Sequence, residues 1–457
     1  MLLSPFSFIQ HPQNASNEIK NVGGIDMERL TKHQYWDKKE RSAQLLEEKE
    51  AVLDQTVVEI IKRVRNEGDP AIRSFTEKFD RVQILDFIVS EEEFAEARKS
   101  VSPAFMKAIK HAAENISQYH KKQLEQSWLD MSEPGKVVGQ KVTPLDRVAI
   151  YVPGGKAAYP STVLMNAIPA KIAGVKHIYI TTPPQADGKI NPYVLVAAKE
   201  AGVENIYKIG GAQSIAAFAY GTESVPKVQK ITGPGNAYVA SAKKWVYGDV
   251  AIDMIAGPSE ILVVADETAN ANFVAADLLS QAEHDEEARA VCITTSDTQA
   301  DAIEQAVRSQ TKNLARKEII EKSLAQHGKI IVVNTLDDAF SIVNDIAPEH
   351  LQLMIANPME KLGAVKHAGA IFLGNYSPEA LGDYVAGPNH TLPTNGTATF
   401  ASPLGVYDFM KKSSVIYYDK PSLLASADTI IEIANTEQLT AHAQSVQIRK
   451  EETDAKL

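Results

Sequence analysis

Apolar residues recur at helical spacing through the first third of the chain, from about residue 36 to residue 126. The clearest stretches run from Glu48 to Asn66 and from Phe94 to Gln123, and apolar residues three or four positions apart share one face of a helix. The acidic run Glu91-Glu92-Glu93 is typical of a solvated helix face. The pattern predicts a largely helical N-terminal region.

From Arg147 onward, short apolar runs alternate with helical stretches, and Gly or Pro closes each of the first three runs. This alternation is typical of βαβ units, which build a parallel sheet with helices on both faces. The runs fall into two series. The first series holds 148–152, 177–181 and 205–209, and the second holds 261–264, 291–294, 330–333 and 370–373. We therefore expect two α/β units, followed by a short mixed tail.

Composition narrows the class of protein without identifying it. The chain has 457 residues, roughly three domain lengths by the usual prior. Its hydrophobic content of 44% and charged content of 23% are ordinary for a globular protein. The net charge of −11 argues against a general nucleic-acid binder, which usually presents a basic face.

The single cysteine, Cys292, excludes an intrachain disulfide, a CxxC zinc site and an iron–sulfur cluster. It lies in a strand-like run, so we interpret it as a packed core thiol rather than a nucleophile. The chain shows no membrane-spanning run, and its start lacks the basic and apolar segments of a secretory signal. We expect the first 26 residues to be a flexible arm, with Met27 as a possible start, and a cytoplasmic location.

The end of the predicted helix 270–284 carries a candidate pair of metal ligands, Gln281 and His284. Because they are three residues apart, they lie on one helical face, where an amide oxygen and a ring nitrogen can share a cation. Taken alone, such a pair is more often an exposed polar helix end.

The Pro348-Glu349-His350 segment places a carboxylate beside an imidazole at a loop or strand entrance. The two groups are proton acceptors of different basicity, which suits acid–base catalysis. An adjacent Glu-His pair is also a common accident of surface composition.

Further along, the polar loop from Gly374 to Gly396 is long enough to be functional or disordered, and it holds Glu379, Asp383 and His390.

The segment from Glu437 to His442 is locally typical of a helix start capped by Thr436 or Thr440, and nothing there marks His442 as a ligand.

Three glycine-rich strand-to-helix turns are the candidate sites for a nucleotide, since their free backbone amides suit anions. They lie at 151–155, 209–213 and 232–236. The G-x-G-x-x-G fingerprint is absent from the sequence, so a standard Rossmann dinucleotide site is not indicated.

Taken together and in order, eight segments between Tyr151 and His442 resemble the histidinol dehydrogenase family. They are YVPGGKAAYPSTVLMNAIPAKIAG, GGAQSIAAFAYGT, ITGPGNAYVASAKK, AGPSEILVVAD, DLLSQAEH, IAPEHLQL, GDYVAGPNHTLPT and EQLTAH. The preceding helical region also fits, so the resemblance covers nearly all of the chain beyond the first 30 or so residues. It implies oxidation of L-histidinol through L-histidinaldehyde to L-histidine, the last steps of histidine biosynthesis, with NAD and one zinc ion per subunit.

The resemblance also implies roles for individual residues. The implied zinc ligands are Gln281, His284, Asp383 and His442. The implied catalytic residues are Glu349 and His350. Substrate contacts fall on the zinc ligands and on Ser259, His350, His390 and Glu437, and NAD contacts fall on Tyr151, Gln213 and Asn236. The family further implies an intertwined homodimer in which Glu437 and His442 reach the partner's active site.

The implied fold is α/β, with two related, incomplete Rossmann-like domains, a helical N-terminal arm and a small C-terminal domain. We expect the arm at 1–35 and a discontinuous first domain, carrying the metal and catalytic residues, at 36–150 and 260–399. An NAD-binding second domain is expected at 151–259, and the C-terminal domain at 400–457.

Three other functions stay open on the residues alone. The first is a zinc and NAD dehydrogenase of the same superfamily for another polar alcohol, such as a sulfonated diol, which the carboxylate of Glu437 would repel. The second is a zinc hydrolase that uses Glu349 to activate water, although it has no use for the three glycine-rich turns. The third is a binding protein without activity, which the intact set of polar residues disfavours.

Overall fold

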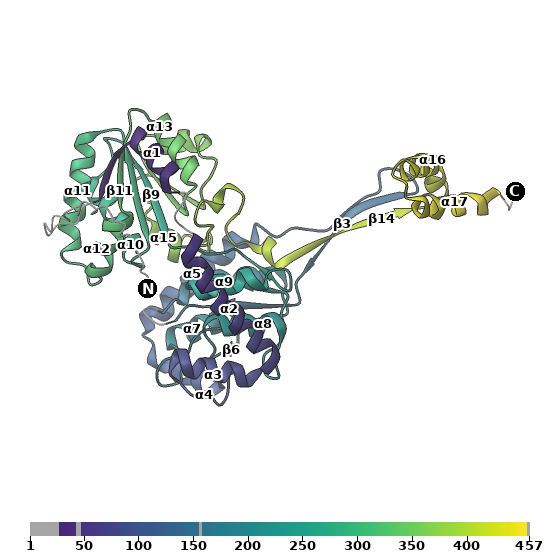
Figure 1. Ribbon diagram of the computed structural model, residues 1–457, viewed down its shortest axis with the longest axis horizontal. Helices are drawn as coiled ribbons and strands as arrows, with labels where there is room; N and C mark the ends of the chain where they lie inside the picture. The colour runs from purple at the N-terminus through teal and green to yellow at the C-terminus, as the bar shows by residue number, and fades with distance from the viewer. Residues whose placement is uncertain (1–26, 43–46, 155–157, 455–457) are drawn as a thin grey trace, which may run out of the picture.

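The structure is a computed structural model that describes residues 27–42, 47–154 and 158–454; the flexible arm expected before Met27 lies outside these residues. Figure 1 shows two lobes, each built around a sheet, and a long ribbon that projects from them toward the C-terminus. None of the helices in the described part of the chain is long and apolar enough to cross a membrane.

The first lobe holds a six-stranded parallel sheet in the order β1-β11-β10-β9-β12-β13. Every residue of β9 and β12 is buried, as expected for central strands covered on both faces. The strands are β1 (Glu28–Thr31), β9 (Glu260–Ala265), β10 (Arg289–Thr294), β11 (Lys329–Val332), β12 (His350–Met354) and β13 (Ala370–Leu373). The helices are α1 (Lys32–Ser42), α10 (Ala271–Ala282), α11 (Asp297–Thr311), α12 (Lys317–His327), α13 (Leu336–Ile346), α14 (Pro358–Lys361) and α15 (Glu379–Tyr384).

The second lobe holds a five-stranded parallel sheet in the order β6-β5-β4-β7-β8. Its strands are β4 (Arg147–Tyr151), β5 (His177–Thr181), β6 (Asn205–Tyr207), β7 (Lys230–Thr232) and β8 (Ala251–Ile252). The crossover helices are α6 (Pro160–Ala173), α7 (Pro192–Ala201), α8 (Gly211–Tyr220) and α9 (Ala237–Val246). The order reverses between β4 and β7, which creates the switch point where α/β sheets usually bind ligands.

The N-terminal helices correct the expected domain boundaries. They are α2 (Glu47–Glu67), α3 (Asp69–Asp80), α4 (Glu91–Ser100) and α5 (Pro103–Lys121), and we expected them to belong with residues 260–399. Instead they cover the five-stranded sheet: Val57 of α2 shares a core with Ala149 and Phe218, and Ile109 of α5 shares one with Val148. The assignment was wrong because amphipathic spacing shows that a helix buries one face but not which sheet it covers.

The expected arm 1–35 and C-terminal domain 400–457 also need correction. The described part of the arm is not separate, because β1 pairs with β11 at the edge of the six-stranded sheet. After residue 400, Leu404, Val406 and Phe409 still pack into the core of the five-stranded lobe.

The chain leaves the lobes only as an antiparallel ribbon in the order β14-β3-β2, with two helices at its tip (Figure 1). We call this ribbon and its two helices the projecting arm. It consists of β2 (Trp128–Asp130), β3 (Lys136–Pro144), β14 (Met410–Tyr418), α16 (Lys420–Thr436) and α17 (Thr440–Asp454).

Candidate active site

Polar side chains gather at the amino-terminal edge of the six-stranded sheet. Glu260 begins β9 and His350 begins the neighbouring β12, and the two strands pair with His350 opposite Ile261. Helix α10 runs back toward this edge and ends just before His284. The sheet therefore brings residues nearly a hundred positions apart to one place.

His350 is held in one orientation by the backbone. Its Nδ1 lies 3.0 Å from the carbonyl oxygen of Glu260, so Nδ1–H donates to that oxygen and Nε2 keeps its lone pair. Nε2 is buried, has no hydrogen-bond partner among the described residues, and lies 3.9 Å from Oδ1 of Asp383. Burial lowers the pKa of His350 below its ordinary value, so the neutral, proton-accepting form prevails near pH 7.

The side chain of Glu349 is also held by the backbone of Glu260. Its Oε2 accepts a 2.9 Å hydrogen bond from the amide of Glu260 and lies 3.6 Å from Nδ1 of His350. Burial, with the nearby carboxylates of Glu260 and Asp383, holds the pKa of Glu349 well above its ordinary value. The pair thus offers two buried proton acceptors that a single residue, Glu260, positions through both of its backbone groups.

Asp383 lies between two imidazoles. Its Oδ1 is 3.9 Å from Nε2 of His350 and 3.9 Å from Nδ1 of His390. His390 donates from Nδ1 to the carbonyl oxygen of Asp383 at 3.1 Å, and its Nε2 lies 3.3 Å from the hydroxyl of Thr162, which comes from the other lobe. The site is therefore closed from the five-stranded side by α6.

A cluster of potential metal ligands adjoins these residues. One ligand atom each from His284, Glu379 and Asp383 lies within 4.8 Å of the others. Oε1 of Gln281 is buried and lacks a hydrogen-bond partner among the described residues. A buried amide oxygen left unpaired is costly, so it is a donor atom suited to a cation at this position.

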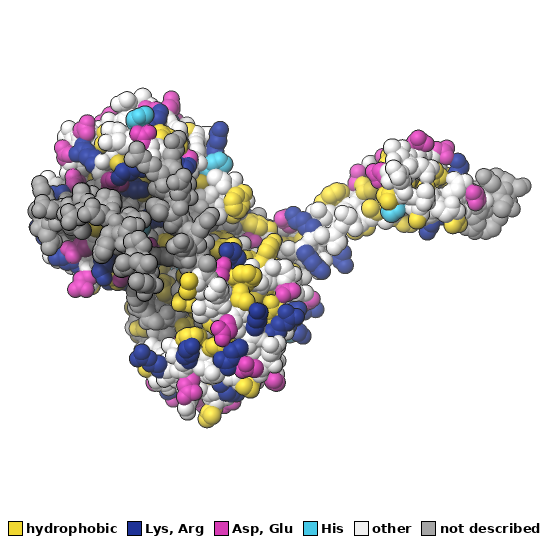
Figure 2. All heavy atoms as spheres, in the orientation of Figure 1, with side chains coloured by type: hydrophobic (Ala, Val, Ile, Leu, Met, Phe, Trp, Pro, Cys, Tyr) yellow, Lys and Arg dark blue, Asp and Glu magenta, His cyan; other side chains and the backbone are white. Residues whose placement is uncertain are grey.

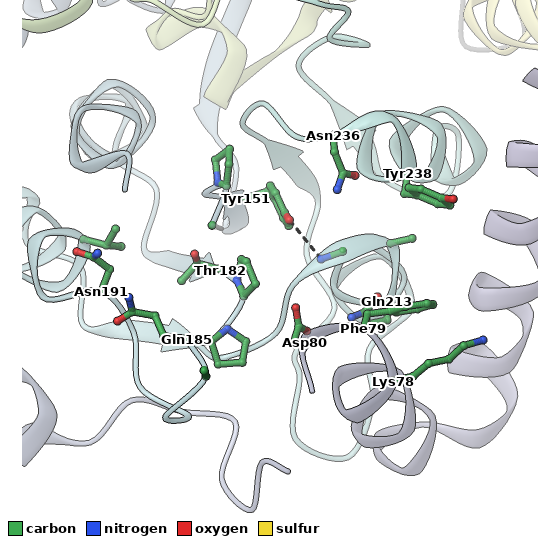
Figure 3. A pocket seen from close by; sticks show the side chains of 18 of the residues that line it. Lys78, Phe79, Asp80, Tyr151, Thr182, Gln185, Asn191, Gln213, Asn236 and Tyr238 are labelled. Carbon is green, nitrogen blue, oxygen red and sulfur yellow. Dashed lines mark hydrogen bonds between the residues drawn. The ribbon is translucent and has the colours of Figure 1, made fainter. Parts of the chain in front are cut away.

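A cavity of about 910 Å³ opens at the carboxyl ends of β4, β5 and β7, at the switch point of the five-stranded sheet (Figure 3). Tyr151, Gln213 and Asn236 all line it. The hydroxyl of Tyr151 accepts a 3.2 Å hydrogen bond from the amide of Gly211, and burial raises the pKa of that hydroxyl to about 12. Both amide atoms of Gln213 are buried and lack partners in the described part of the chain, so they are available to a ligand.

Glycine is required at one turn of this cavity. Gly233 has a φ of +104°, and a Cβ there would lie 2.1 Å from the carbonyl oxygen of Tyr151. Asn236 caps α9, because its side-chain oxygen accepts a 3.1 Å hydrogen bond from the amide of Val239. Only its amide nitrogen remains to donate to a ligand.

The profile of the histidinol dehydrogenase family matches residues 43–450 of the chain. The chain belongs to the histidinol dehydrogenase family. It is 54% identical to histidinol dehydrogenase of Oceanobacillus iheyensis over 429 residues, which cover 94% of this chain and all of that protein. The relative from Bacillus subtilis strain 168 is 54% identical over 396 residues, covering 87% of this chain and 93% of its own.

A solved structure supports the same assignment. The crystal structure of histidinol dehydrogenase from Elizabethkingia anophelis matches with a TM-score of 0.85 and 40% identity, covering 88% of this chain and 93% of that chain. The predicted family and α/β fold are confirmed, and membership of the histidinol dehydrogenase family makes the chain an oxidoreductase.

Within this histidinol dehydrogenase fold, two of the expected site residues lie apart from the rest. Glu437 follows the last residue of α16, and His442 lies in the first turn of α17. Both helices form the tip of the projecting arm, far from α10 and α15 (Figure 1). Within one chain, His442 therefore does not meet Gln281, His284 and Asp383. Ser259, in contrast, directly precedes Glu260 at the site.

Two features of the site were not predicted from the sequence. The first is that the segment 374–396, expected to be a polar loop, contains the helix α15. Glu379 begins this helix, lies near His284 and Asp383, and accepts a 2.8 Å hydrogen bond from Ser280. Burial raises the pKa of Glu379 to about 8. The four-residue spacing of Glu379 and Asp383, which places two carboxylates on one helical face, was the available signal.

Proposed function

We propose that this protein oxidises L-histidinol through L-histidinaldehyde to L-histidine in two successive steps, the last of histidine biosynthesis, with zinc and NAD. One observation carries the proposal. The backbone of Glu260 forms hydrogen bonds with both Glu349 and His350. Nε2 of His350 lies beside Asp383 and has no hydrogen-bond partner among the described residues. A neutral imidazole beside a cluster of oxygen and nitrogen ligands suits an alcohol oxidation that needs a base and a cation.

The described residues fit a zinc ion. We propose that Gln281, His284 and Asp383 hold it, and that His442 of a second copy of the chain completes the set. The unpartnered Oε1 of Gln281 and the close approach of His284 and Asp383 support this assignment. Nitrogen and oxygen donors of this kind suit zinc or a neighbouring first-row ion. Zinc would supply a template that orients the substrate's amine and imidazole.

The cavity of the five-stranded lobe fits a dinucleotide. We propose that Tyr151, Gln213 and Asn236 contact NAD there, and the unpaired amide of Gln213 supports this. NAD would accept the hydride in each step, whereas the protein supplies orientation and proton transfer. On this proposal, the five-stranded lobe is the cofactor domain and the six-stranded lobe carries the metal and catalytic residues.

His350 and Glu349 perform the proton transfers in this scheme. In the first step, its Nε2 takes the alcohol proton while the carbinol hydrogen leaves as hydride, and the aldehyde forms. Glu349 then takes a proton from water as the water adds to the aldehyde, while the protonated Nε2 of His350 gives its proton to the carbonyl oxygen; the hydrate forms and His350 is neutral again. In the second step, His350 takes the hydrate's hydroxyl proton as the second hydride leaves, and the carboxylic acid results. Ser259 and His390 contact the substrate.

The projecting arm supports a homodimer with intertwined subunits. Several of its apolar side chains are exposed in the single chain (Figure 2), among them Trp128 at 54%, Ile416 at 75% and Ile433 at 55%. Exposed apolar surface on a narrow extension favours burial against another chain. We propose that the arm reaches a second copy, where His442 completes the metal site and Glu437 binds the substrate's ammonium group.

The fully buried thiol of Cys292 fits a reducing cytoplasm, which we propose as the location.

The decisive experiment is an NADH absorbance assay with L-histidinol before and after chelation of metal. The proposal expects two NADH per histidinol, loss of activity on chelation, and recovery on addition of zinc. One NADH per histidinol, or full activity in the chelated protein, would contradict it.

A further inference from the structure

The ring of His390 links the two lobes of the protein. Its Nδ1 donates to the backbone carbonyl oxygen of Asp383 at 3.1 Å, on α15 of the six-stranded lobe. Its Nε2 lies 3.3 Å from the hydroxyl oxygen of Thr162, in the first turn of α6 of the five-stranded lobe. Because a carbonyl oxygen only accepts, the proton lies on Nδ1, and Nε2 accepts from the hydroxyl. One ring thus joins a helix of the metal cluster to α6.

The residues on either side of His390 are attached to the same helix. Asn389 donates from Nδ2 to the carbonyl oxygen of Met165 at 2.5 Å. Thr391 accepts at its hydroxyl oxygen a 3.3 Å hydrogen bond from Nδ2 of Asn166. All four of these residues are buried. Each residue of the segment 389–391 is therefore fastened to α6 by a hydrogen bond of its own.

The start of α6 borders both of the proposed ligand sites. Ala158, just before the helix, lines the cavity of about 910 Å³ proposed for NAD. It also lines a second cavity of about 400 Å³, together with Tyr159, Ser161 and His284. Since His284 belongs to the metal cluster, this short segment lies beside the cofactor cavity and beside the metal cluster at once.

We propose that Thr162 is a positioning residue for hydride transfer. Its hydroxyl fastens His390 to α6, and the fastened ring sets how far a substrate at the metal cluster lies from the cofactor in the large cavity. The requirement is strict, because reacting atoms must lie about 3–3.5 Å apart and a misplacement of about 1 Å can cost about a hundredfold in rate. The inference rests on the proposed function, since it needs both ligands in these places.

The hydroxyl, rather than the methyl group, carries this role. Thr162→Val keeps the shape of the side chain and removes its only donor. The side chain of His390 is 12% exposed, so its Nε2 then loses a partner in a buried setting. A buried acceptor without a donor is costly, and the ring turns toward another donor and no longer holds the two lobes in place.

The test measures the rate of NADH formation in single turnovers of L-histidinol at saturating NAD. In Thr162→Val this rate should fall about tenfold, the effect of one lost hydrogen bond, whereas the amplitude should stay at the wild-type value. Thr162→Ser keeps the donor and should react at close to the wild-type rate. The matched control is Thr311→Val, because Thr311 is also buried in a helix, α11, and its hydroxyl donates to the backbone of Val307.

A structural role for Thr162 would give a different result. It would reduce the number of competent sites, so the amplitude would fall while the remaining sites reacted at the wild-type rate, and this outcome would overturn the inference. Two further measurements do not depend on turnover. The zinc content of Thr162→Val and its affinity for NAD, measured by calorimetry, should equal those of wild type. A loss in either would show that Thr162 supports ligand binding rather than placement, which also overturns the inference.

A double-mutant cycle tests whether Thr162 acts through His390. In a His390→Ala background, Thr162→Val should not lower the single-turnover rate further, because no ring remains for the hydroxyl to hold. A further loss as large as that in the wild-type background would place the effect of Thr162 elsewhere and overturn the inference.

Two outcomes distinguish this inference from the proposal beneath it. If wild type forms two NADH per histidinol and Thr162→Val reacts at the wild-type rate, only the role of Thr162 is overturned. If wild type does not oxidise L-histidinol, the proposed function itself is overturned.

Discussion

Nδ1 of His350 lies 3.0 Å from the backbone carbonyl oxygen of Glu260, and the two residues begin the neighbouring parallel strands β12 and β9. Because a backbone carbonyl can only accept, the contact fixes the proton on Nδ1 and leaves Nε2 free to accept one. The sheet itself therefore sets the tautomer that general-base catalysis requires.

Replacing His350 with Gln should lower kcat for both oxidations by about 10² to 10⁴, the usual contribution of a general base. The two half-reactions are measured separately, with L-histidinol and with L-histidinaldehyde as substrates. A large loss in only one of them would contradict a shared base.

The pH dependence of kcat/KM should report His350. Burial lowers its pKa below 6.5, so the basic form persists to lower pH than for an exposed histidine. Activity should hold through neutral pH and fall on acidification, as Nε2 takes a proton and stops accepting one. A pH–rate profile whose acidic limb lies above pH 7 would contradict this assignment.

Replacing Glu349 with Gln should impair the aldehyde oxidation more than the alcohol oxidation, because only the second requires an activated water. The measurement compares NADH formed from L-histidinaldehyde with NADH formed from L-histidinol in single turnovers. The exposed neighbour Glu360→Gln is the control. Equal losses in both half-reactions would rule out water activation as the role of Glu349.

Metal binding should depend on the cluster between α10 and α15. Asp383→Asn or His284→Ala should lower bound zinc to a small fraction of one ion per subunit, measured by atomic absorption after dialysis. Asp337→Asn is the matched control, because Asp337 is exposed on α13. Normal zinc content in the Asp383 and His284 variants would contradict the proposed ligands.

The proposed exchange of arms predicts complementation between two inactive variants. A dimer of His284→Ala and His442→Ala chains would hold one site with both wild-type residues, if His442 acts in the partner's site. Refolding an equal mixture should restore about a quarter of wild-type activity, since half of the dimers are mixed and half of their sites are intact. No recovery would place His442 in its own chain's site or outside any site.

Several features could be predicted from the sequence because they depend on local patterns. Seven strands of the two parallel sheets coincide with the predicted short apolar runs, and Cys292 is buried as expected. Strands β1, β7, β8 and β12 were not among those runs. Strand β12 was harder to predict from the sequence, because His350 and Gln352 interrupt its apolar pattern. Every residue of the strand is nevertheless buried. The stretch from Phe94 to Gln123 is two helices, α4 and α5, separated before Pro103.

By itself, the sequence determined the family, the alternation of strands and helices, and the residue types of the candidate site, because periodicity, turn chemistry and motif order are local properties of the chain. Only the tertiary structure decided that α2 to α5 cover the five-stranded sheet, that Glu379 lies beside His284, and that His442 lies at the end of an arm. It also decided that Asp80 lines the large cavity and that its Oδ2 is buried without a hydrogen-bond partner among the described residues. These are relations between segments distant in sequence, and they follow from which apolar faces pack together rather than from any local pattern.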